Sequence, residues 1–197
     1  MHAKNPWLLS FAAALVILAV ATPLSPQASA RPQAQKRIAA VRRPEVVRHL
    51  QAVRLLQGIT SKQKETWKFE RLMGKPPTPA SEIVFRTTSL RYRRWAFSLW
   101  AHRATQVRRL ALHPPHLNAW LCIHRYEGSW TDDGAPYYGG LQMDLGFQSR
   151  YGRRLLHRKG TANHWTPLEQ MWVAERAYKS GRGFYPWPNT ARWCGLI

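Results

Sequence analysis

The fold is decided by residues 120–145, which read WLCIHRYEGSWTDDGAPYYGGLQMDL. Trp120 and Ile123 are spaced as on one face of a helix, and Glu127 continues that face. At the C-terminal end of a buried helix, the helix dipole and desolvation both disfavour a charged carboxylate. We therefore expect Glu127 to retain a proton and to be able to act as a general acid. An exposed or salt-bridged glutamate would fit the same spacing.

This helix is expected at Leu117–Tyr126, and a turn and a short hairpin follow it. Turn-forming residues fill Ser129–Tyr138, and an extended or hairpin stretch is expected at Tyr137–Met143. Gly139-Gly140 belongs to neither a phosphate loop nor a dinucleotide-binding motif. The two glycines indicate either a plain tight turn or a backbone that a bulky ligand approaches closely.

The remainder of the C-terminal part is expected to hold two helices and an irregular tail. The first helix is expected at Gly146–Tyr151, before a basic loop. Thr166-Pro167-Leu168-Glu169 combines a capping box with a proline at the first helical position, which predicts a second helix that ends at Ser180-Gly181. Pro186 and Pro188 interrupt both helix and strand, so the tail is expected to be irregular.

The N-terminus has the pattern of an export signal, over residues 1–30. Lys4 precedes an apolar run, Trp7–Ala21, and Ala28-Ser29-Ala30 follows as a small-residue cleavage site. An uncleaved membrane anchor is the alternative, because the apolar stretch approaches the roughly 20 residues that a spanning helix needs. We expect export and cleavage.

The chain contains two cysteines. In the oxidising compartment that export implies, we expect Cys122 and Cys194 to form a disulfide, with two buried free thiols as the alternative. Closing a loop of about 70 residues contributes on the order of 4 kcal/mol in the chain-entropy treatment.

The charge is strongly positive and unevenly distributed, with 30 Lys and Arg residues against 10 Asp and Glu. Residues 31–115 contain 19 of the basic and 4 of the acidic residues, and residues 116–197 contain 10 and 6. A basic region of this kind can be a solvated helical face, or can hold a protein on anionic membrane lipids or wall polymers. Nucleic acid is not expected as a partner, because no recognition helix or single-strand module is visible.

This basic region is expected to contain a flexible arm and then helices. Arg31–Arg43 lacks apolar periodicity and predicts the arm. Capping residues, glycines and prolines delimit the helices. They are expected from Pro44 to Gly58, from Thr60 or Ser61 to Gly74, and from Thr88 to Leu112.

No metal or cofactor site is expected. His113 and His116 are close in sequence but flank two prolines, and no set of Cys and His residues has the spacing of zinc ligands. No cofactor-binding motif is present either.

The C-terminal part contains an ordered set of residues that together resemble a known family. They are Trp120, Cys122, Glu127, Trp130, Tyr138-Gly139-Gly140-Leu141-Gln142, Thr166, Glu169-Gln170, Pro186-Trp187-Pro188 and Cys194-Gly195. Over His116–Ile197 the set resembles the resuscitation-promoting-factor-like transglycosylase domain, a compact member of the lysozyme-like superfamily. The resemblance implies a mainly α fold of the α+β lysozyme-like kind, with a short β-like segment and a substrate groove. It also implies a secreted or wall-associated enzyme that cleaves the β-1,4 bond between N-acetylmuramic acid and N-acetylglucosamine in peptidoglycan.

The resemblance also assigns roles to individual residues. Glu127 takes the position of the family's catalytic glutamate. The residues expected to bind the glycan are Tyr138, Gln142, Gln170, Trp187 and Trp130. From the sequence alone, Trp187 is either a core residue or a platform on which a sugar ring stacks, since it is held between two prolines.

The chain departs from the family in two places. In the family a cysteine directly precedes the catalytic glutamate, whereas four residues separate Cys122 from Glu127 here. A shift of four residues is one helical turn along nearly the same face, so a bridge to Cys194 remains possible. The segment between Glu127 and Trp130 is also shorter, which changes that wall of the groove.

Several functions stay open at this level. One glutamate can act as acid and then as base to close a 1,6-anhydro ring, whereas attack by water would give a lysozyme-type product. Asp132, Asp133 and Asp144 are the nearby carboxylates, and none is assigned as a second catalytic group. A non-catalytic peptidoglycan-binding module is the main alternative, and a cationic membrane-active or nucleic-acid-binding protein is a third. The sequence does not define an oligomeric state.

Overall fold

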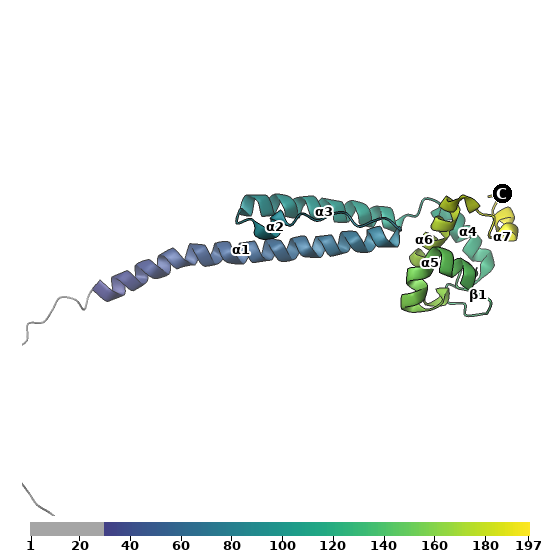
Figure 1. Ribbon diagram of the computed structural model, residues 1–197, viewed down its shortest axis with the longest axis horizontal. Helices are drawn as coiled ribbons and strands as arrows, with labels where there is room; N and C mark the ends of the chain where they lie inside the picture. Colours follow the sequence, from purple (N-terminus) through teal and green to yellow (C-terminus); the bar gives the residue numbers. More distant parts are fainter. Residues whose placement is uncertain (1–29) are drawn as a thin grey trace, which may run out of the picture. The chain divides into compact units, whose positions relative to one another are not determined.

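The computed structural model describes residues 30–197 (Figure 1). It divides into two units, with the boundary between Val46 and Val47. The predicted export signal, apart from Ala30, lies outside the described residues. Within residues 30–197, no helix combines the length and the hydropathy needed to cross a membrane.

A single helix, α1 at Ala30–Leu72, replaces the expected arm and the first two helices of the basic region. The prediction of a flexible arm at Arg31–Arg43 was wrong, because its Ala, Gln, Lys and Arg residues are good helix formers. Pro44 lies inside α1 and does not begin a helix. Gly58 does not end one, and a Cβ there would lie 2.7 Å from a ring carbon of Phe97. The glycine therefore serves close packing.

The rest of the basic region agrees with the prediction more closely. Gly74 follows the end of α1, as expected, and a short helix that was not predicted, α2, covers Ile83–Arg86. The helix α3 at Leu90–Leu112 is capped by Ser89, whose side chain accepts a hydrogen bond from the backbone of Tyr92. Within the second unit α3 runs back alongside α1 (Figure 1). The buried residues of their shared cluster are Ile59, Val84, Ala96 and Trp100.

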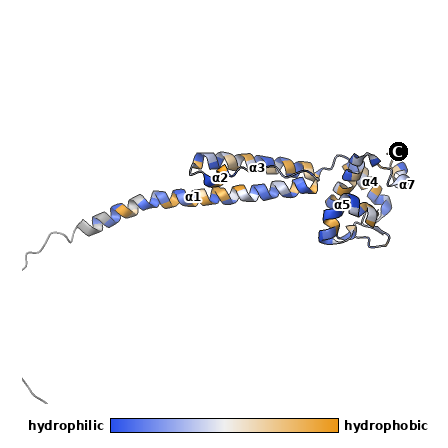
Figure 2. Ribbon diagram, in the orientation of Figure 1, coloured by the Kyte–Doolittle hydropathy of each residue, from blue (hydrophilic) through white to orange (hydrophobic). Residues whose placement is uncertain are grey.

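The hydropathy of α1 and α3 is mixed along their length (Figure 2). Trp100 is 4% exposed, whereas Trp95 on the same helix is 57% exposed. Arg93 is buried and donates to the backbone carbonyls of Val84 and Thr87, so it belongs to the interior and not to a solvated basic face. The exposed basic side chains of α3 lie at Arg91, Arg94, Arg108 and Arg109.

The C-terminal part is helical around one small hairpin, as expected for a mainly α fold. Strand β1 pairs with β2 in antiparallel register, Tyr137 opposite Asp144 and Tyr138 opposite Met143. The elements in order are α4 Leu117–Glu127, β1 Tyr137–Tyr138, β2 Met143–Asp144, α5 Leu145–Lys159, η2 Ala162–His164, α6 Pro167–Ala177, η3 Tyr178–Arg182 and α7 Pro188–Trp193.

Two expectations for this part need correction. The loop expected after Tyr151 is helical, since α5 continues to Lys159. At its start α5 is capped by Asp144, whose carboxylate accepts a hydrogen bond from the backbone of Phe147 at 2.7 Å. The tail is not irregular throughout. Pro188 occupies the first turn of α7, a position where a missing N–H group is tolerated, and so it begins a helix where an interruption was expected.

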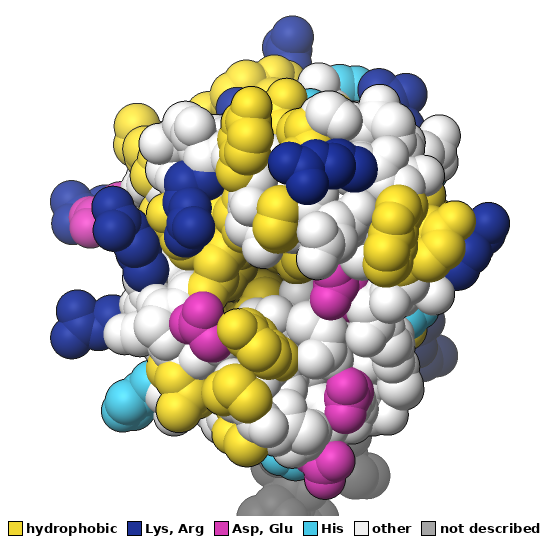
Figure 3. All heavy atoms as spheres, turned by 90° about the vertical axis from the view of Figure 1, so that its right-hand side faces the viewer, with side chains coloured by type: hydrophobic (Ala, Val, Ile, Leu, Met, Phe, Trp, Pro, Cys, Tyr) yellow, Lys and Arg dark blue, Asp and Glu magenta, His cyan; other side chains and the backbone are white. Residues whose placement is uncertain are grey.

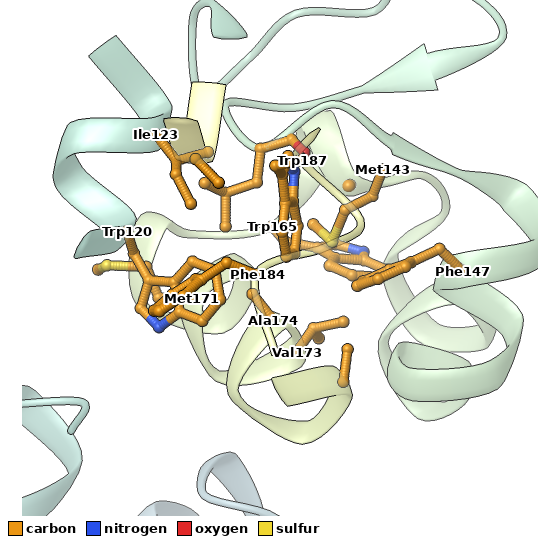
Figure 4. Packing of buried hydrophobic residues seen from close by; sticks show 14 residues of the cluster. Trp120, Ile123, Met143, Phe147, Trp165, Met171, Val173, Ala174, Phe184 and Trp187 are labelled. Atoms are coloured by element: carbon orange, nitrogen blue, oxygen red, sulfur yellow. The ribbon is translucent and has the colours of Figure 1, made fainter. Parts of the chain in front are cut away.

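A core rich in aromatic rings holds these elements together (Figure 4). Trp187 packs against Trp120 and Phe147, with ring centroids 5.1 and 5.5 Å apart. The predicted capping box of α6 is present, with reciprocal hydrogen bonds between Thr166 and Glu169. The aromatic pairs connect α4, α5 and the tail, so the core fixes the end of α4 relative to α7.

Buried polar groups on α6 connect it to its neighbours. The carboxylate of Glu175 is fully buried and accepts from the indole of Trp120 at 2.9 Å and from the backbone of His116 at 2.8 Å. Arg176 donates to the carbonyls of Tyr151 and Leu72. Burial lowers the pKa of Arg176 to about 10, which still leaves it charged at neutral pH. These contacts hold α4, α5 and the end of α1 on one central helix.

Candidate active site

Glu127 is the last residue of α4, where Gly128 ends the helix at a φ of 143°. Its side chain is half-buried, and its Oε1 accepts a hydrogen bond from the hydroxyl of Thr190 at 2.7 Å. Thr190 lies in α7 and is 5% exposed. A residue 63 positions away along the chain therefore holds one oxygen of this carboxyl group.

The disulfide between Cys122 and Cys194 is confirmed, with the two Cα atoms 6.0 Å apart. Cys122 lies on α4, and Cys194 directly follows α7. The bridge forms although four residues separate Cys122 from Glu127. The bridge ties together the two helices that supply Glu127 and Thr190.

A cavity of about 200 Å³ lies beside Glu127. Figure 3 shows a hollow on this side of the C-terminal part, with hydrophobic and acidic side chains next to it. Of the described residues that line the cavity, Glu127 alone is acidic. The lining residues are Glu127, Tyr137, Gln142, Pro186, Trp187, Pro188 and Asn189. The wall therefore combines apolar rings, two amides and one carboxyl group.

The cavity brings three of the predicted site residues together, namely Glu127, Gln142 and Trp187. Trp187 is only 4% exposed, and its indole donates to the carbonyl of Leu141 at 2.6 Å. Of the two alternatives for this tryptophan, the core residue is the one present. Trp187 lines the cavity together with Pro186 and Pro188, but at this exposure its ring offers no broad face for stacking.

Tyr138 does not line the cavity, whereas Tyr137 does. Successive residues of a strand point to opposite faces. Tyr138 faces the core and is half-buried against it, and Tyr137 is 49% exposed on the cavity side. The role of Tyr138 in binding the glycan stays a prediction, and its neighbour Tyr137 is the tyrosine that lines the cavity.

Gln170 and Trp130 lie behind the cavity wall. Gln170 is fully buried, and its amide nitrogen donates to the carbonyls of Trp130, Ala162 and Trp165. Trp130 stacks on His124 with the ring centroids 3.9 Å apart. Neither residue is among those that line the cavity, and both lie against the turn at Gly139-Gly140. Their role in binding the glycan stays a prediction.

The same two residues account for the paired glycines. A Cβ on Gly139 would lie 2.5 Å from the amide oxygen of Gln170, and one on Gly140 would lie 2.5 Å from the His124 ring and 2.7 Å from the Trp130 ring. Side chains of the protein itself lie close to the backbone of Gly139 and Gly140. The crowding by these side chains explains why both positions are glycine, and neither glycine is among the residues that line the cavity.

Two of the three nearby aspartates are already engaged. Asp144 caps α5. Asp132 is half-buried, accepts from the amide nitrogen of Gln142 at 2.6 Å and accepts from the backbone of Gly134 at 3.1 Å. The third aspartate, Asp133, is exposed.

The sequence missed Thr190, Asn189, Tyr137 and the link between Asp132 and Gln142. A start signal for α7 was present in Pro188, and it would have placed Asn189 and Thr190 in the first turn of a helix. Nothing local to the sequence pairs Thr190 with Glu127.

No family model, no curated protein and no solved structure matches this chain. Within residues 30–197, no three His, Cys, Asp or Glu side chains are grouped as a metal site would require.

Proposed function

We propose that this protein cleaves the glycan strands of peptidoglycan, with Glu127 as the general acid and base of a lysozyme-like transglycosylase domain at residues 116–197. One observation carries the proposal. Glu127 is the only acidic side chain among the described residues that line the cavity, and it stands half-buried among apolar rings and amides. A carboxyl group in such a wall is suited to protonate a glycosidic oxygen.

The shape and composition of the cavity suit a sugar. The rings of Tyr137, Pro186 and Pro188 offer apolar surface for the face of a pyranose, and the amides of Gln142 and Asn189 offer hydrogen bonds to its edge. At about 200 Å³ the cavity is smaller than the roughly 300–1,000 Å³ pockets that enclose drug-sized ligands. A glycan strand would lie across it with one group inserted beside Glu127.

The reaction needs one carboxyl group, first in its protonated form as an acid and then in its ionised form as a base. Protonated Glu127 gives its proton to the oxygen that leaves C1 of N-acetylmuramic acid. The resulting carboxylate then removes the proton from the 6-hydroxyl of the same sugar, whose oxygen bonds to C1 and closes a 1,6-anhydro ring. Glu127 ends the cycle protonated, and no water is consumed.

Thr190 can accompany both states of Glu127. Its hydroxyl donates to the carboxylate at 2.7 Å. When Glu127 is protonated, the same hydroxyl can turn toward the carbonyl of Trp187, 3.4 Å away, and its oxygen can accept from the carboxyl proton. The carboxyl group therefore keeps a partner throughout the cycle.

The engagement of the aspartates favours ring closure over attack by water. Glycosidases that use water or a covalent intermediate need a second carboxyl group about 5 to 9.5 Å from the first. Asp144 and Asp132 are both committed to hydrogen bonds within the protein, and Asp133 is exposed. Glu127 is the single carboxyl group among the described residues that line the cavity, and one carboxyl group is enough for the intramolecular reaction.

The proposal includes a secreted or wall-associated location. The disulfide between Cys122 and Cys194 fits an oxidising compartment. The exposed basic side chains of α1 and α3 would hold the protein on anionic wall polymers or on a membrane surface. The alternative function, a non-catalytic peptidoglycan-binding module, would use the same cavity and the same basic helices.

A Glu127→Gln variant separates the two functions. The amide keeps the shape and still accepts from Thr190, but it cannot supply a proton. We expect lysis of purified peptidoglycan, followed by turbidity, to fall at least about 100-fold, while co-sedimentation with peptidoglycan persists. Glu82→Gln is the matched control, because Glu82 is exposed at the N-cap position before α2. If the wild-type protein sediments with peptidoglycan but releases nothing from it, the binding-module function replaces the enzyme.

A further inference from the structure

The hydrogen bonds around Gln142 determine which way its amide faces. The nitrogen Nε2 lies 2.6 Å from the Asp132 carboxylate and 3.1 Å from the carbonyl of Gly139. When Asp132 is ionised, its carboxylate and the Gly139 carbonyl can accept hydrogen bonds but cannot donate them. If the amide were turned over, its oxygen would face two other oxygens. The nitrogen is therefore fixed toward the protein, and the oxygen faces away from these two groups.

The surroundings of Gln142 hold it in this position. Gln142 has a φ of 46°, in the left-handed region that residues other than glycine rarely adopt. Its backbone N–H donates to Gly139 at 3.0 Å and closes the hairpin turn. Such strain persists only where the surroundings impose it, and it is frequent at ligand sites.

Asp132 is itself fixed. One carboxylate oxygen accepts from the backbone of Gly134 at 3.1 Å, so the other must face Gln142. The pair also lies against the residue after Glu127, because a Cβ on Gly128 would be 3.4 Å from Asp132 Oδ2 and 3.5 Å from Gln142 Nε2. Asp132 thus acts on the cavity wall through Gln142, directly beside Glu127.

We propose that Asp132 is a positioning residue that locks the Gln142 amide with its oxygen toward the cavity, so that the site selects a ligand group that donates a hydrogen bond. In a glycan that group is a hydroxyl or the N–H of an acetamido substituent. The substrate class follows from the proposed function, on which this inference rests. The orientation itself follows from the acceptors around Nε2.

Replacing Asp132 by asparagine gives a directed prediction. The backbone of Gly134 still requires an acceptor, so the amide oxygen of the new side chain stays there and its nitrogen faces Gln142. Gln142 must then turn over to offer its oxygen to that nitrogen. The cavity would present an N–H group where it had presented an oxygen, and a donor on the sugar would meet a donor on the protein.

The experiment uses the purified protein and two readouts. One is the affinity for a soluble tetramer of N-acetylglucosamine, measured by calorimetry beside the glucose tetramer that lacks acetamido groups. The other is KM and kcat for peptidoglycan. We expect Asp132→Asn to weaken tetramer binding roughly tenfold and to raise KM by a similar factor. Asp133→Asn removes the same charge from an exposed neighbour and should change neither.

A second variant restores the acceptor. In the double variant Asp132→Asn with Gln142→Glu, the new carboxylate accepts from the new amide nitrogen and turns its other oxygen to the cavity. We expect only part of the affinity to return, because an acceptor again faces the cavity but the new carboxylate oxygen faces the carbonyl of Gly139 and cannot donate to it as Gln142 does. A purely structural role for Asp132 would give no rescue, and the melting temperature of each variant checks the fold.

The outcomes separate this inference from the proposed function. Equal affinities and KM values for Asp132→Asn and Asp133→Asn would overturn the inference even if the wild type cleaves peptidoglycan. A loss that the double variant does not restore would also overturn it.

A wild type that binds the tetramer without cleaving peptidoglycan would overturn the catalytic proposal alone, while the binding readout would still decide on Asp132. A wild type that neither binds nor cleaves would overturn both. A weaker effect with the glucose tetramer would identify the acetamido N–H as the group selected.

Discussion

At the scale of single residues, the hydrogen bond between Thr190 and Glu127 is the contact on which the catalytic proposal depends most. Thr190→Val keeps the shape of the side chain and removes the hydroxyl. We expect kcat on peptidoglycan to fall roughly tenfold with little change in KM, because the carboxyl group loses the partner that orients it.

The matched control for this prediction is Thr190→Ser, which keeps the hydroxyl. Its kcat should remain within a few-fold of the wild-type value. A Thr190→Val variant with wild-type turnover would mean that the contact at 2.7 Å does not orient the catalytic group.

The sequence predicted the position of a residue well where a local rule applies, and less well where the position depends on a contact with a residue distant in the chain. The spacing from Trp120 predicted that Glu127 ends a buried helix, and the structure agrees. The role of Thr190 depends on a contact across 63 residues, and no local pattern encodes it. For Gln170 the motif was found, but its burial follows from the packing of the hairpin turn on α6.

At the scale of elements, the disulfide should control both the stability and the site, since it joins α4 to the end of α7. The double variant Cys122→Ala and Cys194→Ala opens a loop with a sequence separation of 72 residues. We expect the free energy of unfolding, measured with denaturant, to fall by on the order of 4 kcal/mol. Activity should fall as well, because Thr190 is no longer tied to Glu127.

Reducing agent provides an independent check of the disulfide. Dithiothreitol should destabilise the wild type toward the level of the double variant and leave the double variant unchanged. Equal unfolding free energies for the oxidised and reduced wild type would contradict the stabilising role.

The capping box of α6 gives a prediction about pH. Burial alone would raise the pKa of Glu169, but the Lys159 ammonium and the hydrogen bonds from Thr166 outweigh it and lower the pKa below its ordinary value of 4.5. A lowered pKa means that the ionised group stabilises the fold above that ordinary value. The stabilisation is lost as pH falls through the lower pKa of the folded protein.

The variant Glu169→Gln tests the direction of this pH dependence of stability. At pH 7 the variant should be less stable than the wild type by about 1 kcal/mol, the usual scale of a capping interaction. Thermal melting between pH 7 and pH 3 should show the difference shrink below about pH 4.5. A difference that grows as the pH falls would contradict the account of Glu169.

The elements that the sequence predicted are those with strong local signals, and those it missed depend on context. The Thr166 capping box, the hairpin and the end of α1 near Gly74 all follow from local rules. Gly58 and Pro44 carry equally strong local signals, yet α1 continues through both. At Gly58 the packing of Phe97 decides, and no property of α1 alone indicates that contact.

At the scale of the whole molecule, the excess of basic residues in α1 and α3 is expected to govern retention on anionic surfaces. Exposed Arg54 and Arg94 border a recess between these helices that Leu55 and Phe97 also line. We expect the double variant Arg54→Ala and Arg94→Ala to bind peptidoglycan that carries anionic polymers on the order of tenfold more weakly at low salt.

Salt and a charge-matched control complete this test. Binding that charge dominates falls steeply as ionic strength rises, so the wild type and the variant should converge at high salt. Arg153→Ala with Arg154→Ala removes two exposed charges from α5 and should have a smaller effect. A wild type whose binding does not depend on salt would contradict retention by charge.

Mass spectrometry of the muropeptides released from purified peptidoglycan tests the central claim most directly. We expect the wild-type protein to release fragments that end in 1,6-anhydro-N-acetylmuramic acid, and the Glu127→Gln variant to release none. Reducing ends that depend on Glu127 would keep the catalytic role and reject ring closure. Release that is equal in the two proteins, or no release by the folded wild type, would contradict the claim that the Glu127 carboxyl group cleaves the glycan.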